Sequence, residues 1–265
     1  MNILKALFGG SEETPEEKQK ADEIRRFDMF KYDGVRAAKM GQTDYAVKCY
    51  REALKIHEDL EVRDYLSQAL IRMGEFDGAR EQLKVLAEAE PDNVAIAVRE
   101  AQTAHMQEDY QGMAAACERA MGVDKDNALV HYLYAQAHIG QGNAVVAVAM
   151  LTRAIALDGN MIDAYLLRGR TLLDMGDTEG AGEDKEYLMT EARESEDVLL
   201  FAARVERAKG NDATALDIYN KVIEVNPFCV DAFRERGAIK YDKGDMNGAK
   251  DDMQTVLELA PEQVA

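Results

Sequence analysis

The side chains that could do chemistry are few and widely spaced. The chain has four histidines, at positions His57, His105, His131 and His138. None stands in an H-E-x-x-H motif or at another spacing typical of metal ligands. No G-x-x-x-x-G-K-S/T loop is present to hold a phosphate. The sequence therefore predicts a protein that is not an enzyme and that uses no metal and no cofactor. An active site assembled from distant residues is the alternative that the sequence leaves open.

The three cysteines also favour packing over chemistry. Cys49, Cys117 and Cys229 are odd in number, far apart and outside any C-x-x-C pair. They predict neither a disulfide framework nor a zinc site, and we expect reduced, buried thiols. His131 and His138 occupy repeat positions that other copies fill with apolar residues, so we expect them to be packing residues as well.

The charge balance limits the partners. The 265 residues include 32 Lys and Arg against 50 Asp and Glu, which gives a formal net charge of −18. A surface this acidic repels a phosphate backbone, so nucleic acid is excluded as an expected partner. No run of about 20 apolar residues and no signal-peptide pattern occurs. We therefore expect a cytoplasmic protein with no integral membrane segment.

Small residues recur along the chain at a spacing of 33 or 34 residues. The first column is Gly41, Gly74, Glu108, Gly142, Gly176, Gly210 and Gly244. A second column follows five residues later, at Ala46, Ala79, Met113, Ala147, Ala181, Ala215 and Ala249. A third column precedes the first by seven residues, at Gly34, Ser67, Ala101, Ala135, Gly169, Ala203 and Gly237. Small side chains let two helices approach closely, so each repeat should be a helical hairpin whose turn glycine adopts a left-handed conformation.

On these columns the chain resembles the tetratricopeptide repeat, a 34-residue helix-turn-helix with the pattern W-x2-L-G-x2-Y, A-x3-F and P. Its Leu-Gly pair survives partly in Leu66-Ser67, and its aromatic residue in the second helix appears as Tyr50 and Tyr219. Pro91, Pro227 and Pro261 fall at the expected proline position. The sequence has no Trp, so that column departs from the pattern. The resemblance implies an all-α fold, a right-handed α-solenoid (superhelix) of tandem helix-turn-helix hairpins.

The repeat divides the chain into an N-terminal part, 1–26, and a seven-repeat domain, 27–263. The expected repeats are 27–59, 60–93, 94–127, 128–161, 162–195, 196–229 and 230–263. Thr14, Pro15 and Glu17 form a capping-box pattern that predicts a helix from residue 15 onward. Apolar residues at Ile3, Leu4, Leu7 and Phe8 form a short amphipathic tag, which we read as a frayed end or a docking segment for a protein or, less favoured, a membrane. In the last repeat, Lys250 and Asp252 predict a polar outer face.

Members of this family bind extended peptides or helices in a concave groove lined by the first helix of each hairpin. Carrying the family's groove positions onto this sequence implies a peptide-binding groove made of Val98, Arg99, Tyr132, Gln136, Ile139, Leu166, Arg170, Leu173, Leu200, Arg204, Arg207, Arg234 and Tyr241. Its middle is apolar and its C-terminal side is rich in arginine.

The arginines leave two interpretations open. Because guanidinium groups pair bidentately with carboxylates, a cluster of Arg170, Arg204, Arg207 and Arg234 favours a protein or peptide partner with acidic groups. The alternative is that nearby acids neutralise the arginines within the chain, at Asp163, Asp174, Asp197 and Glu235.

The fourth repeat is unusually poor in charge. Arg153 and Asp158 are the charged residues of 128–161. An apolar strip of Val145, Val146 and Ala149 should face outward, which predicts an oligomer interface and a homodimer. The alternative is that neighbouring hairpins or the N-terminal tag cover this strip.

The expected function is therefore a non-enzymatic scaffold or adaptor that holds a partner polypeptide in its groove. The competing hypothesis is a structural self-assembly module whose main role is homo-oligomerisation through the fourth repeat. A fold alone does not prove a function, so both hypotheses need a test.

Overall fold

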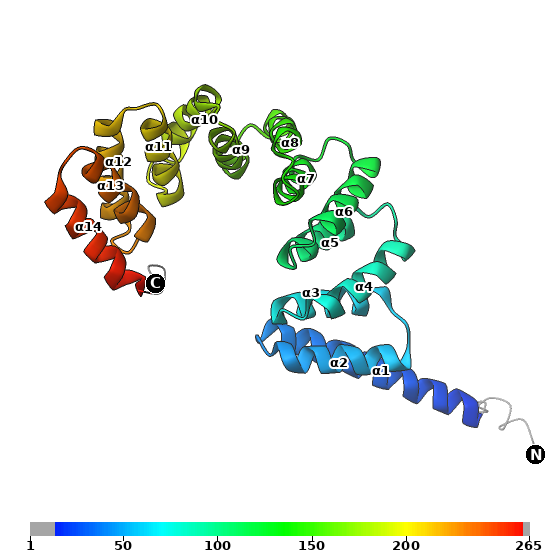
Figure 1. Cartoon of the computed structure of the whole chain (residues 1–265). Helices are drawn as coiled ribbons and strands as arrows, with labels where there is room; N and C mark the ends of the chain where they lie inside the picture. Colours follow the sequence, from blue (N-terminus) through cyan, green and yellow to red (C-terminus); the bar gives the residue numbers. More distant parts are fainter. Residues whose placement is uncertain (1–13, 262–265) are drawn as a thin grey trace, which may run out of the picture. The chain divides into compact units, whose positions relative to one another are not determined.

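The computed structural model describes residues 14–261 as a succession of α-helices (Figure 1). That part of the chain contains fourteen helices and no strand. The helices are α1 (Pro15–Lys39), α2 (Thr43–Ile56), α3 (Leu60–Met73), α4 (Phe76–Ala89), α5 (Val94–Met106), α6 (Tyr110–Val123), α7 (Ala128–Gly140), α8 (Ala144–Leu157), α9 (Ile162–Asp174), α10 (Thr178–Glu191), α11 (Glu196–Ala208), α12 (Asp212–Val225), α13 (Val230–Asp242) and α14 (Met246–Leu259). The apolar tag at Ile3 to Phe8 lies outside the described residues.

Odd-numbered helices pair with the even-numbered helices that follow them. The hairpins are α1–α2, α3–α4, α5–α6, α7–α8, α9–α10, α11–α12 and α13–α14. Within the compact parts described below, the second helix of a hairpin also packs against the first helix of the next one. The predicted all-α class and tandem hairpin architecture are confirmed.

The hairpins form two compact units. The N-terminal unit contains α1 to α6 and ends at Val123, and the C-terminal unit contains α7 to α14 and begins at Asp124. Each unit has its own core, and Figure 1 shows the hairpins following one another in chain order within each unit. The predicted residue boundaries of the repeats remain predictions.

The turns between the two helices of each hairpin follow one backbone design. Six of them place a glycine at a φ between 74° and 84°, at Gly41, Gly74, Gly142, Gly176, Gly210 and Gly244. The turn between α5 and α6 places Glu108 there instead, at φ 55°. Glycine reaches this left-handed region without a steric cost, so the sequence column is explained by helix termination.

The other two small-residue columns lie in the core. All seven residues of the column from Gly34 to Gly237 are buried, and six of the seven residues from Ala46 to Ala249 are buried. Close helix approach therefore accounts for both columns, as predicted. The capping box at the start of α1 is confirmed too, because Glu17 N–H donates to the Thr14 hydroxyl while Thr14 N–H donates to the Glu17 carboxylate.

One expectation about the last hairpin is wrong. Asp252 does not contribute to a polar outer face, because it is buried between α13 and α14. Arg236 donates to both of its carboxylate oxygens, at 3.0 and 2.5 Å, and Lys240 Nζ lies 2.9 Å away. The α9–α10 hairpin contains the same bidentate arrangement, in which Arg168 donates to buried Asp184 at 3.0 and 2.6 Å. A carboxylate can be buried in a core when a cation pairs with it and satisfies its hydrogen bonds.

Candidate functional site

The predicted groove residues are carried by the first helix of their hairpins. In the C-terminal unit, α7, α9, α11 and α13 carry eleven of them, from Tyr132 to Tyr241. Val98 and Arg99 lie on α5 in the N-terminal unit. The structure therefore brings together the residues from Tyr132 to Tyr241 within one compact unit, and Val98 and Arg99 belong to a separate one.

The apolar members of the predicted groove pack inward with part of each side chain. Tyr132 and Ile139 of α7 pack against the core of Ala135, Leu151 and Ala164 and stay half-buried. Leu166 and Leu173 of α9 pack in the same way against the next core and are also half-buried. Leu200 differs, because it is buried in the α11–α12 core and contributes little open surface. Four apolar side chains on two consecutive first helices thus remain partly available to a ligand.

Polar groups extend this surface. Gln136 is half-buried and its amide donates to the Tyr132 hydroxyl, at 3.2 Å. Burial raises the pKa of Tyr132, which disfavours the phenolate form. At the other end of the surface, Tyr241 of α13 is exposed.

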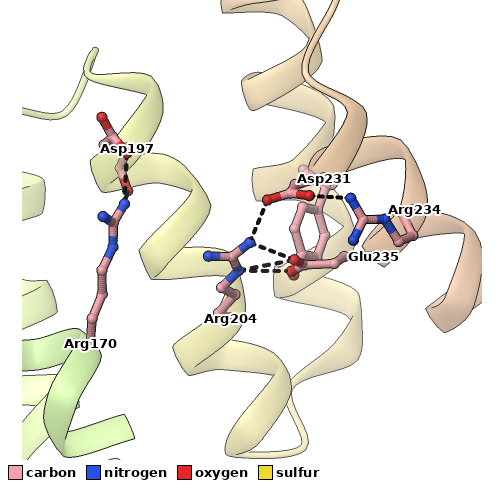
Figure 2. A network of polar contacts seen from close by, with 7 residues as sticks. Arg170, Asp197, Arg204, Asp231, Arg234 and Glu235 are labelled. Carbon is pink, nitrogen blue, oxygen red and sulfur yellow. Dashed lines mark hydrogen bonds and ion pairs between the residues drawn. The ribbon is translucent and has the colours of Figure 1, made fainter. Parts of the chain in front are cut away.

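Arg170 and Arg204 of the C-terminal unit form ion pairs between consecutive first helices (Figure 2). Arg170 of α9 donates to Asp197 of α11, at 2.7 Å. Arg204 of α11 donates to Glu235, at 2.6 Å, and to Asp231, at 3.0 Å, both on α13. Arg234 pairs with Asp231 in turn, as Figure 2 shows.

Arg207 completes the set, with its guanidinium 3.6 Å from Asp242. Each of the four clustered arginines therefore has a carboxylate of this chain within ion-pair distance. Asp197 and Glu235, two of the four acids named from the sequence, are among these partners.

The sequence reasoning missed two members of this network, Tyr219 and Asp231. The buried Tyr219 hydroxyl donates to Glu235, at 2.6 Å. Burial, reinforced by this hydrogen bond, raises the pKa of Tyr219, and the hydrogen bond from Arg204 to Glu235 raises the pKa of Arg204. A signal for Asp231 existed, because it follows Arg204 by 27 residues just as Asp197 follows Arg170.

The N-terminal unit uses the same kind of contact. Arg99 of α5 pairs with Asp64 of α3. Lys31 of α1 pairs with Asp59, at 3.3 Å, and with Glu61, at 2.6 Å, beside the start of α3. Ion pairs that link consecutive first helices are therefore a recurring structural feature of this chain.

The predicted oligomer strip lies on the first half of α8. Val145 is 71% exposed and Val146 is 39% exposed, and Ala149 is exposed as well. Farther along the helix, Arg153 pairs with Asp126, at 2.5 Å. The strip faces outward as expected, so it is an apolar surface within the C-terminal unit.

Residues 14–261 contain no cluster of three or more histidines, cysteines or acids arranged to hold a metal ion. His131 is buried, with ring Nε2 2.9 Å from the carbonyl oxygen of Lys125, and His138 packs edge-on against Tyr134. The cysteines are free and buried, and burial raises the pKa of Cys117 to about 12. Within the described helices none is long and apolar enough to cross a membrane.

Comparisons with known proteins agree with this architecture. A tetratricopeptide-repeat family model matches residues 66–128. A solved tetratricopeptide repeat protein from Parabacteroides merdae superposes with a TM-score of 0.74 over 89% of this chain and 94% of that one, at 13% identity. Residues 66–128 match the tetratricopeptide repeat, and the hairpins on either side of them share its fold.

Two further matches share only parts of these repeats. YrrB, described as a TPR protein with an unusual peptide-binding site, superposes with a TM-score of 0.57 over 68% of this chain and 93% of that chain, at 15% identity. The CTR9 homolog of Arabidopsis thaliana is 26% identical over 121 residues. Those residues make up 45% of this chain and 11% of the Arabidopsis protein, so this chain spans a small part of that relative's length. The tetratricopeptide fold supports protein-interaction scaffolds in general, and these repeats are typically non-catalytic.

Proposed function

We propose that this chain is a non-enzymatic scaffold or adaptor that holds a partner polypeptide on the first helices of its C-terminal unit. One observation carries the proposal: Tyr132 and Ile139 of α7 and Leu166 and Leu173 of α9 anchor in the core yet stay half-buried. A ligand can bury the remaining apolar surface while the anchored side chains lose little conformational entropy. The peptide-binding site ascribed to YrrB supports a polypeptide as the class of partner.

The same surface can bind acidic groups of the partner, if a partner carboxylate replaces one of the chain's own acids on an arginine. Arg170 and Asp197 form the more exposed pair, with side chains 36% and 68% accessible. A partner carboxylate can replace Asp197 on Arg170 because water already solvates both groups. Arg204 is held by two acids and positions α11 against α13. Replacing Arg170 and Arg204 together with Ala should weaken partner binding by more than about 1 kcal/mol and flatten its salt dependence. An unchanged affinity with helicity retained would assign these arginines to internal pairing alone.

The experiment that tests the scaffold is quantitative capture from a native lysate with the wild type and two matched variants. Leu166→Gln places an amide on the half-buried apolar surface. Val225→Gln places an amide at an exposed position at the end of α12. We expect the first variant to lose a partner that the wild type and the second variant both retain, with helicity equal in all three. A capture profile that is identical for the three proteins would contradict the proposal.

The second candidate is homo-oligomerisation through α8, favoured by the outward-facing Val145, Val146 and Ala149. A symmetric dimer would cover this charge-poor strip. Val146→Glu should then abolish association, because a buried charge would be left unpaired. Thr214→Glu is the matched control, since Thr214 is exposed at the same repeat position two hairpins later. A wild type that sediments as a monomer, or equal association by both variants, would reject the α8 interface.

We place the scaffold in the cytoplasm, on the strength of its three free cysteines, which suit a reducing compartment. A fluorescent fusion in the source cells tests that location directly.

A further inference from the structure

An aromatic side chain fits over a glycine where two hairpins of the C-terminal unit meet. Phe201 of α11 is fully buried with its ring against Gly169 of α9. A Cβ at Gly169 would collide with Cζ of Phe201, so the glycine leaves the space that the ring occupies. We call the glycine position the seat and the aromatic position the knob. Here Gly169 is the seat, and Phe201, from the first helix of the following hairpin, is the knob.

The last hairpin has a glycine at the seat position. Gly237 of α13 is at the same repeat position as Gly169, and atoms of its own hairpin are its nearest neighbours within 4 Å. An open depression of about 550 Å³ lies over it, lined by Gly237, Ala238, Tyr241, Met246, Ala249 and Met253 together with the charged residues Arg207, Asp242 and Lys250. Met253 is 40% exposed, whereas its counterparts Leu83, Leu151 and Tyr219 are fully buried. Within the described residues, this face of the last hairpin is therefore uncovered.

The first hairpin repeats the knob. Tyr32 of α1 is at the repeat position of Phe201 and is 68% exposed. Met29, three residues earlier, is 50% exposed, whereas its counterparts Val62 and Val198 are buried. The first hairpin thus presents an aromatic knob at a position where the chain elsewhere buries one.

Contacts inside the two units show which repeat position of one hairpin packs against which repeat position of the next. In the N-terminal unit, Tyr50 of α2 contacts Tyr65 of α3, with ring centroids 5.7 Å apart. In the C-terminal unit, the Tyr219 hydroxyl reaches Glu235 by the same step from a second helix to the next first helix. Met253 shares the position of Tyr50 and Tyr219, and Tyr32 shares that of Tyr65 and Glu235. The same rule therefore pairs Met253 with Tyr32.

We propose that the first hairpin of one copy of this chain stacks on the last hairpin of a second copy, with Tyr32 seated over Gly237 and against Met253. A methionine edge and an aromatic ring make favourable contacts, and the remaining lining of the seat mixes apolar residues with Arg207, Asp242 and Lys250. The contact is head-to-tail, so a stack of two copies still has one free knob and one free seat, and association grows with concentration. The occupant is a second copy because this one sequence supplies both halves of a contact that it already uses internally. This stack does not involve the α8 strip. Its seat shares Arg207 and Tyr241 with the predicted groove but includes none of the α7 and α9 side chains that carry the proposed function.

Sedimentation velocity over a range of concentrations, with single variants and their mixture, tests the stack. The wild type should form species larger than a dimer as its concentration rises. Tyr32→Lys removes the knob and Met253→Lys blocks the seat, and each variant alone should raise the dissociation constant at least tenfold, because a charge would be buried without a partner. An equimolar mixture should form a complex of two chains and nothing larger, since one sound knob and one sound seat remain. Tyr32→Phe should associate as the wild type does.

The controls separate this proposal from the others. Tyr45→Lys, a matched change at an exposed tyrosine of α2, should leave association unchanged. Partner capture by Tyr32→Lys should equal that of the wild type, so the stack and the scaffold can fail independently. A wild type that is monomeric at every concentration, a mixture that does not associate, or self-association that survives in Tyr32→Lys but not in Met253→Lys would each overturn the head-to-tail stack.

Discussion

At the scale of single residues, the backbone of the α5–α6 turn departs from the other six. Glu108 holds the left-handed conformation that glycine holds elsewhere, and a residue with a Cβ carries a steric cost there of roughly 1 kcal/mol. We expect Glu108→Gly to stabilise the chain by roughly 0.5–1 kcal/mol, after the extra flexibility that glycine gives the unfolded state. Gly142→Ala is the matched control and should destabilise by a similar amount. Urea unfolding of the three proteins measures both, and a destabilising Glu108→Gly would show that the turn is fixed by something other than φ.

Glu206 gives a pH dependence whose sign is set by one hydrogen bond. Lys185 donates to the buried Glu206, at 2.5 Å, and this contact holds the pKa of Glu206 below its ordinary value of 4.5. The contribution to stability is therefore complete above pH 4.5 and is lost as the pH falls through the folded-state pKa. Glu206→Gln should be less stable than the wild type at pH 7, and this difference should shrink as the pH falls below 4.5. Unfolding curves at several pH values decide it, and a difference that does not vary with pH would assign Glu206 a purely steric role.

The structural role of a residue could be predicted from the sequence where the local backbone geometry requires that residue type. Glycine marked six of the seven hairpin turns, and Glu108 holds that position in the seventh, because positive φ and helix termination are local requirements. The role of Asp252 could not be predicted in this way. Its partner Arg236 is 16 residues away on the other helix of the hairpin, so the sequence shows an acid on a helix and not the cation that allows its burial.

At the scale of elements, the Arg168–Asp184 pair joins α9 to α10. Removing one member of a buried ion pair leaves the other uncompensated, whereas replacing both by apolar residues is often neutral. Asp184→Leu should therefore destabilise by about 3 kcal/mol, and Arg168→Met with Asp184→Leu should recover most of that loss. Burial raises the pKa of Asp184 despite the opposing effect of Arg168, which agrees with a costly desolvation. Chemical unfolding of both variants measures the coupling, and two variants of equal stability would mean that the pair is independent of α9–α10 packing.

Helices and hairpins were predictable because small residues recur with the period of the repeat. The ion pairs that link one hairpin to the next were harder to predict. The acids Asp197 and Glu235 could be named as neighbours of the arginines, but the sequence did not say which arginine each acid pairs with. Arg170 meets Asp197 across 27 residues of sequence and Arg204 meets Glu235 across 31. Pairs this distant depend on how consecutive hairpins are packed, which no local pattern encodes.

At the scale of the whole molecule, the repeat period continues through the point where the two compact units divide. Residues 123 and 124 lie within the third repeat predicted from the sequence, directly after Gly122, and no proline lies beside the division. The columns of small residues predict the hairpins, but they do not predict how strongly one group of hairpins joins the next. The outward direction of Val145 and Val146 was predictable, because it follows from the helical period of one element.

The central claim is that the first helices of the C-terminal unit form a surface for a polypeptide partner. Hydrogen–deuterium exchange of the chain alone and in complex with its captured partner tests this claim most directly, because it reports each helix separately. We predict slower amide exchange in α7, α9 and α11 on binding, with α8, α10 and α12 unchanged. Protection confined to α8, or exchange in α7, α9 and α11 that the partner does not alter, would contradict the account.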